Sequence, residues 1–194
     1  MLAAVRTVAP AVKVVSLDQA RMQCRIDSND EDELLSVLID AAVAHFDGPS
    51  GILGRALITQ TWRQDFPSFA DVVRLPVGTL IAVSSVSYYD ANNASQTLSS
   101  NVYTSFNDEV GPYLTLKPLQ SWPPTYSRED AVRVTWTAGY GSTADLVPAA
   151  IRQAMLLMIS NWYSNRGAAV IGASVADLPF AVSSLISPYR RVGV

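Results

Sequence analysis

The longest regular alternation of apolar and polar positions runs from Asp145 to Gly167 and predicts the main helix of the chain. Six residues recur at the three-and-four spacing of one helix face, namely Ile151, Ala154, Met155, Met158, Ile159 and Trp162. Leu156, Leu157 and Tyr163 widen this face, so we expect a helix that is buried on more than one side. Asp145 is the expected N-cap, Pro148 fits a first turn, and Gly167 is the expected stop.

Two shorter helices are predicted near the amino terminus. Ser16 to Gln19 has the spacing of a capping box and opens a helix that extends to about Arg25. The segment 27–33 carries five carboxylates directly before an apolar run, which favours the start of a second helix over a metal or catalytic site. This second helix is expected to end before Gly48 and Pro49.

Between residues 55 and 140 the pattern changes to short β-type runs separated by Pro, Gly, Asn and Asp. The runs are 57–66, 72–76, 80–90, 101–106, 113–118 and 131–140. Alternation is clearest where Val132, Val134 and Trp136 oppose polar residues. No helical pattern intervenes, so we expect an antiparallel sheet or a small sandwich, with turns at 90–93 and 107–112.

These patterns predict an α+β fold in which an antiparallel β domain interrupts a helical body. The body comprises two N-terminal helices and one long C-terminal helix, in residues 16–54 and 141–166. The β insertion spans residues 55–140. An extended arm, residues 1–15, precedes the body, and an extended tail, residues 167–194, follows it.

Composition points to association with other protein. Hydrophobic residues make up 49% of the chain and charged residues 16%, and mean hydropathy is +0.18, which suggests apolar surface that meets a partner. Of the 14 basic residues only Lys13 and Lys117 are lysine, and arginine is the cation favoured at interfaces. The net charge of −3 argues against sequence-specific DNA binding.

Few residues suggest chemistry. His45, the only histidine, sits near the end of a predicted helix, and a structural role is favoured. Cys24 stands alone, which excludes an internal disulfide and a cysteine zinc site. The glycines of 139–142 lack the Walker lysine and predict a strand-to-helix turn. We expect no cofactor, no metal and no enzymatic activity. The four tryptophans could stack on bases or sugars, but core packing is favoured because three of them sit at predicted core positions or next to Pro123 and Pro124. No run has the length and composition of a membrane span.

The order of several segments resembles the head-tail connector, or adaptor, family of long-tailed bacteriophages and gene transfer agents. The segments are GRALITQTWRQDFPSF, LPVGTLIAVSSVSYYD, VRVTWTAGYGSTADLVPAAIRQAMLLMISNWYSNRG and LISPYRR, and the resemblance covers about residues 16–191. It implies a structural virion protein of the neck, assembled in the bacterial cytoplasm. It also implies a dodecameric ring beneath the portal protein that contacts a tail-completion or stopper protein, with genomic double-stranded DNA passing through. The family implies no catalytic residues.

The segment after Gly167 is apolar but shows no convincing helix period. Ordering it costs about 1 to 2 kcal/mol per residue, more than its few apolar side chains return on burial. We therefore expect a portal or a neighbouring subunit to complete it, with 181–186 added as a strand to a partner sheet. The candidate partner-interface residues are Leu178, Phe180, Leu185, Ile186, Pro188, Tyr189, Arg190 and Arg191. The alternative is a tail wrapped on its own body.

Two other function classes are kept beside the connector. A ligand- or glycan-binding β module would present Tyr88, Tyr89, Tyr103 and Tyr126 on an exposed face. An enzyme would need His45 or the acidic cluster at the mouth of a pocket.

Overall fold

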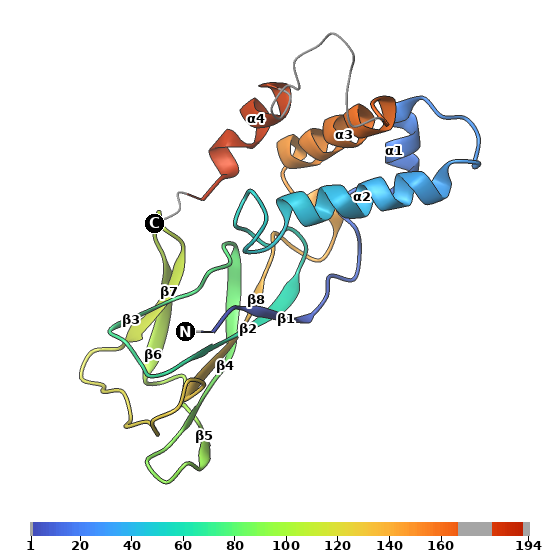
Figure 1. The fold of residues 1–194 in the computed structure, drawn as a ribbon. Helices are drawn as coiled ribbons and strands as arrows, with labels where there is room; N and C mark the ends of the chain where they lie inside the picture. The colour runs from blue at the N-terminus through green and yellow to red at the C-terminus, as the bar shows by residue number, and fades with distance from the viewer. Residues whose placement is uncertain (1, 167–179, 192–194) are drawn as a thin grey trace.

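The computed structural model describes residues 2–166 and 180–191, and it shows helices gathered at one end and strands at the other (Figure 1). The β region lies in the sequence between two N-terminal helices and the C-terminal helices. The predicted α+β class with an antiparallel β insertion is therefore confirmed.

The N-terminal helices follow the predicted local signals. Helix α1, Leu17–Cys24, begins with the complete capping box, in which the Gln19 amide donates to Ser16 Oγ and the Ser16 amide donates to Gln19 Oε1. Helix α2, Asp32–Phe46, begins within the acidic segment, with Asp32 and Glu33 in its first turn, and ends before Gly48. The acidic segment is thus the start of a helix, as predicted.

The main C-terminal helix starts later than predicted. Residues Ala144–Leu146 form a short 3₁₀ turn, η1, and helix α3 spans Ala149–Ser164 with Pro148 as its N-cap. Asp145 therefore does not cap α3, because Pro148 separates its turn from the helix and has no amide hydrogen to continue the bonding. The helix also ends earlier than the expected stop at Gly167, because its last residue is Ser164 and its C-cap is Asn165. Gly167 itself lies outside the described residues. The apolar face is buried as predicted at Ile151, Ala154, Met155, Met158 and Ile159.

The β region forms two antiparallel sheets. The five-stranded sheet has the order β1-β2-β8-β4-β5, with β1 Val5–Val8, β2 Gln60–Phe66, β8 Val132–Ala138, β4 Leu80–Tyr89 and β5 Ser95–Thr97. The three-stranded sheet has the order β3-β7-β6, with β3 Val72–Arg74, β7 Pro112–Leu116 and β6 Tyr103–Asn107. Part of the expected extended N-terminal arm is therefore an edge strand, β1, which pairs with β2.

Two hydrophobic cores organise these elements. One core joins α1, α2, α3 and the C-terminal helix, and includes Leu35, Phe46 and Met155. The other lies between the two sheets and includes Trp136, which is fully buried, and Leu114. The register of β2 on β8 places Trp62 opposite Trp136, and alternate residues of β8 point into the core. The predicted core positions of these tryptophans are confirmed.

Candidate partner-binding surface

The described part of the C-terminal segment packs on the helices of its own chain. Helix α4, Phe180–Ile186, lies beside α3, and the 3₁₀ turn η2, Ser187–Tyr189, follows it (Figure 1). Val182 and Ile186, four residues apart on one face of α4, are both buried in the helical core. Leu185 and Tyr189 are partly buried against the same core.

This arrangement corrects two expectations. Residues 181–186 form a helix and not a strand, so strand addition by this segment is wrong. Residues 180–191 settle on the body of a single chain, which is the alternative of a wrapped tail. The physical reason is that α3 offers an apolar face wide enough to receive Val182 and Ile186, and short helices become stable through such docking.

The candidate interface residues divide into exposed and internal groups. Phe180 is 87% exposed, and Pro188 and Arg190 are also exposed, so all three are accessible to a partner. Ile186 is only 1% exposed and serves the core of its own chain. Leu178 lies outside the described residues. Val182, which the sequence reasoning did not select, is an internal anchor of the segment.

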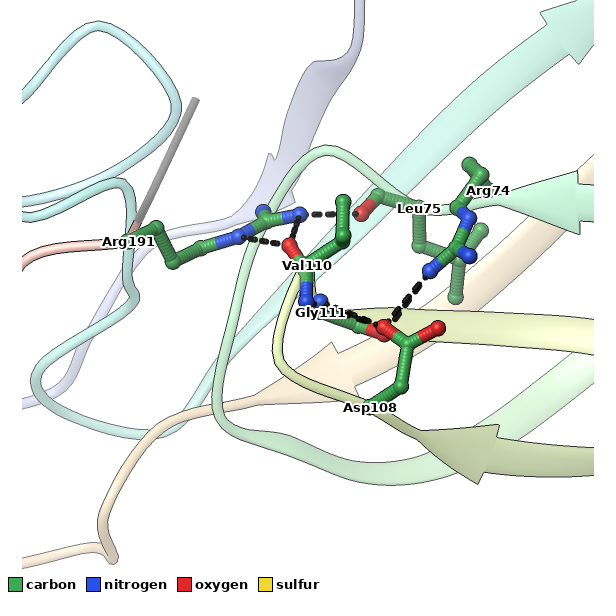
Figure 2. A network of polar contacts seen from close by, with 6 residues as sticks. All are labelled: Arg74, Leu75, Asp108, Val110, Gly111 and Arg191. Atoms are coloured by element: carbon green, nitrogen blue, oxygen red, sulfur yellow. Dashed lines mark hydrogen bonds and ion pairs between the residues drawn. The ribbon is translucent and has the colours of Figure 1, made fainter. Parts of the chain in front are cut away.

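Arg191 reaches from the C-terminal segment into the loops of the β region (Figure 2). Its Nε and Nη2 donate to the Val110 carbonyl oxygen at 2.8 and 2.6 Å, Nη1 donates to the Pro76 carbonyl, and Nη2 lies 3.5 Å from the Leu75 carbonyl oxygen. The Arg191 amide donates to the Leu53 carbonyl. Two loops that are distant in sequence therefore converge on one guanidinium.

Asp108 shapes the loop that supplies the Val110 carbonyl (Figure 2). Its Oδ1 accepts from the amides of Val110 and Gly111, both at 3.0 Å, and from Arg74 Nη1 at 2.7 Å. The Arg74 hydrogen bond is the main cause that lowers the pKa of Asp108 to about 2. This carboxylate is therefore ionised at neutral pH and keeps the turn closed.

Residues that could have supported an enzyme do not come together. His45 packs edge to face on Phe46, with ring centroids 5.4 Å apart, near the end of α2. Among residues 2–166 and 180–191, no group of three His, Cys, Asp or Glu side chains is placed to hold a metal ion. Residues 139–142 connect β8 to η1 as a turn, as predicted, and Gly139 has a positive φ of 145°.

The four tyrosines of the proposed glycan-binding module do not form one exposed face. Tyr103 is only 8% exposed and belongs to the core between the sheets. Tyr88 packs edge to face on Phe69, and the Arg128 guanidinium covers the ring of Tyr89 at 3.7 Å from its centroid. Tyr126 is exposed. This arrangement lacks the open aromatic platform that the alternative requires.

None of the helices that the structure describes is both long enough and apolar enough to span a membrane.

Comparison with solved structures finds likeness along almost the entire chain. A chain from the neck of an empty gene transfer agent (GTA) particle, treated with C6 symmetry, matches with a TM-score of 0.79 and 22% identity, covering 100% of this chain and 97% of that chain. A chain from the virion of a native GTA particle matches with a TM-score of 0.77 and 22% identity over the same shares. A chain from a native GTA neck, treated with C12 symmetry, matches with a TM-score of 0.66 and 21% identity, over 98% and 97% of the two chains.

A comparison with curated protein sequences gives no significant match. The model of one protein family, described as Phage gp6-like head-tail connector protein, matches residues 14–122, more than half of the chain. This family is structural, in agreement with the expectation that the chain is not an enzyme. The match includes α1, α2 and the strands from β2 to β7. The order of these elements was predicted from the sequence, except for the short strand β5, which lies in none of the predicted runs. The chain belongs to the Phage gp6-like head-tail connector protein family.

Proposed function

We propose that this chain is a ring-forming connector in the neck of a phage or GTA particle, between the portal protein and a tail-completion or stopper protein. The observation that carries the proposal is the likeness over its whole length to chains from GTA necks, one of them treated with C12 symmetry. A ring of twelve copies agrees with that symmetry. The chain would be assembled into the virion in the bacterial cytoplasm.

Exposed apolar side chains support association with further copies. Met22 is 72% exposed on α1, Val37 is 60% exposed on α2, and Phe180 is 87% exposed on α4. Removing these apolar side chains from water by covering them with another protein surface favours association. Their positions on three helices make the helical end a candidate contact region in the ring. We propose that Phe180, Pro188 and Arg190 contact the portal or a neighbouring subunit.

Genomic DNA would pass through such a ring without sequence-specific binding. The net charge of −3 provides no excess of cations to neutralise phosphates. A channel without a strong positive field displaces few of the counterions that surround DNA, so it binds the DNA weakly and allows it to slide.

The proposed division of labour follows the two cores. Residues 16–54 and 141–166 would act as the helical unit that assembles the ring, and residues 55–140 as the β unit. The two hydrophobic cores support this division, although Leu57 and Ile58, at the start of the β unit, pack in the helical core.

Mass measurement of the purified protein, alone and with portal protein, tests the ring. Twelve copies of the 20.9 kDa chain give an assembly of about 250 kDa. We expect native mass spectrometry of the protein alone to show this assembly, or of the mixture with portal to show the mass of the portal increased by these twelve copies. A chain that stays monomeric at high concentration and with portal present would refute the proposal. Electrophoretic retardation of duplex DNA by the assembly at physiological salt would refute free passage.

A further inference from the structure

The slot that holds the Arg191 side chain, defined by Gly54, Gly78, Gly111 and the carbonyls of Leu75, Pro76 and Val110, has features of a built recognition site. A Cβ atom placed on Gly111 would lie 2.2 Å from Arg191 Nη2, and one placed on Gly78 would lie 3.2 Å from Arg191 Cδ. At Gly54 the corresponding distance to Arg191 Cδ is 3.4 Å. Three loops therefore leave out side chains where the arginine passes.

The hydrogen-bonding groups of the slot suit a guanidinium in particular. A guanidinium carries donors in a fixed planar fork, and here Nε, Nη1 and Nη2 all donate to backbone carbonyls. Lysine ends in a single ammonium and cannot reach carbonyls on two separate loops with the same geometry. Among the described residues no carboxylate forms a salt bridge with Arg191, since Asp108 pairs with Arg74. Recognition therefore depends on shape and on neutral acceptors.

The slot also joins the two hydrophobic cores. Leu53, whose carbonyl accepts from the Arg191 amide, belongs to the helical core, whereas Leu75 and Val77 belong to the core between the sheets. Arg55 Nε donates to the Tyr189 carbonyl at 2.7 Å and holds the same segment two residues earlier. The segment continues back to α4, which is docked on α3.

We propose that this slot is a guanidinium-recognition site whose ligand is Arg191, and that it fixes the C-terminal segment, and with it the helical end, to the loops of the β region. Arg191 is a positioning residue in this arrangement. The inference does not depend on ring formation or on a place in the neck, because it concerns contacts within one chain.

Burial agrees with a joint that can be tested by removing its ligand. Desolvation is the main cause that lowers the pKa of Arg191, and repulsion from Arg55 and Arg74 adds to it. Burial of the charged guanidinium is therefore unfavourable by itself, and the hydrogen bonds to the three carbonyls must offset it. The neighbouring Arg190 is exposed, and no hydrogen bond or salt bridge of its side chain is found among the described residues. These two adjacent arginines form a matched pair, one in the slot and one outside it.

The experiment compares Arg191→Ala with Arg190→Ala by hydrogen exchange of the full chain. In Arg191→Ala we expect exchange of amides in 75–78, 108–111 and 187–191 to accelerate about tenfold or more, because charge-assisted hydrogen bonds are lost. Arg190→Ala should exchange like the wild type. Ethylguanidinium at low, non-denaturing concentration should restore protection in Arg191→Ala, whereas ethylammonium should not.

Two further variants keep the proposal open to refutation if Arg191→Ala fails to fold. Arg191→Lys keeps the positive charge but lacks the guanidinium, so its amide exchange in 75–78, 108–111 and 187–191 should be as fast as in Arg191→Ala. In Gly78→Ala the new Cβ would lie 3.0 Å from Arg55 Cγ and 3.2 Å from Arg191 Cδ, and because both side chains hold this segment, exchange in 187–191 should accelerate. The proposal is overturned by wild-type protection in Arg191→Lys, by unchanged exchange in Gly78→Ala, by equal effects of the two alanine variants, or by rescue with ethylammonium.

Discussion

The docking of α4 on α3 yields a quantitative prediction, because only two side chains of α4, Val182 and Ile186, are buried. Ile186 is 1% exposed and packs in the helical core, whereas Phe180, on the same helix, is 87% exposed. The change Ile186→Ala therefore removes buried methyl and methylene groups from the docked state. Phe180→Ala removes a larger side chain that contacts mainly solvent, and it is the matched control.

The expected magnitude follows from burial. Truncating a fully buried isoleucine to alanine costs about 2 to 5 kcal/mol. Helix α4 spans only Phe180–Ile186, and so short a helix is not stable without its docking surface. Undocking should therefore also unfold α4, and a loss of about 2 kcal/mol raises the open population about 30-fold.

Hydrogen exchange with mass spectrometry measures this population directly. Amides of 180–189 should exchange about 30-fold faster or more in Ile186→Ala at the low end of the expected cost. Amides of β8, which lie in the core between the sheets, should keep their protection. In Phe180→Ala the exchange of 180–189 should stay close to that of the wild type.

Two results would refute this reasoning. Unchanged exchange in Ile186→Ala would mean that α4 is not held by its buried face. Equal acceleration in Phe180→Ala would mean that the exposed aromatic ring also stabilises the docked helix in the free chain. If Phe180→Ala leaves exchange unchanged but weakens portal binding, the residue acts at a partner surface.

Three further predictions concern other parts of the chain. The folded pKa of Asp108 is about 2 and the unfolded value is about 4, so the stability that its carboxylate provides should be present above pH 4 and disappear as the pH falls through 2. In urea unfolding, Asp108→Asn should lose less unfolding free energy than the wild type between these pH values. An equal loss in the two proteins would contradict this role of Asp108. Burial is the main cause that raises the pKa of Asp47, so its contribution to stability should be greatest below about pH 4 and be lost as the pH rises through the higher folded pKa. From acid to neutral pH, the unfolding free energy of Asp47→Asn should therefore decline less than that of the wild type. The same pH dependence in both proteins would contradict this prediction. Ser16→Ala breaks the capping box and should lower the unfolding free energy by about 0.5 to 2 kcal/mol, whereas Ser164→Ala, at the exposed end of α3, should not; equal effects would show that the cap has no role.

Local signals predicted much of the fold because they are written in neighbouring residues. The capping box at Ser16 and the alternation around Trp136 each reflect a periodicity that backbone geometry imposes. Helix α3 starts later than the sequence predicts: Asp145 is a good cap by residue type, but Pro148 separates its 3₁₀ turn from the helix. The sequence does not predict strand β1, because all four of its residues are exposed and they show no alternation of apolar and polar positions.

Local sequence patterns predicted less about the candidate partner-binding surface of the C-terminal segment. Helix α4 has two buried residues, Val182 and Ile186, too few to show a helical period. Its apolar content correctly suggested a need for cover, but the sequence could not say that α3 of the same chain provides it. The Arg191 slot draws on residues more than eighty positions away.

By itself the sequence determined the order of α1, α2, the main strands of residues 55–140 and α3, together with their apolar faces, because these depend on residue type and short-range spacing. Only the tertiary structure decided which surface covers the C-terminal segment, which of its side chains remain exposed, and where Arg191 is held. Those outcomes depend on contacts between residues far apart in the chain, whose free energies are realised only when the folded elements meet.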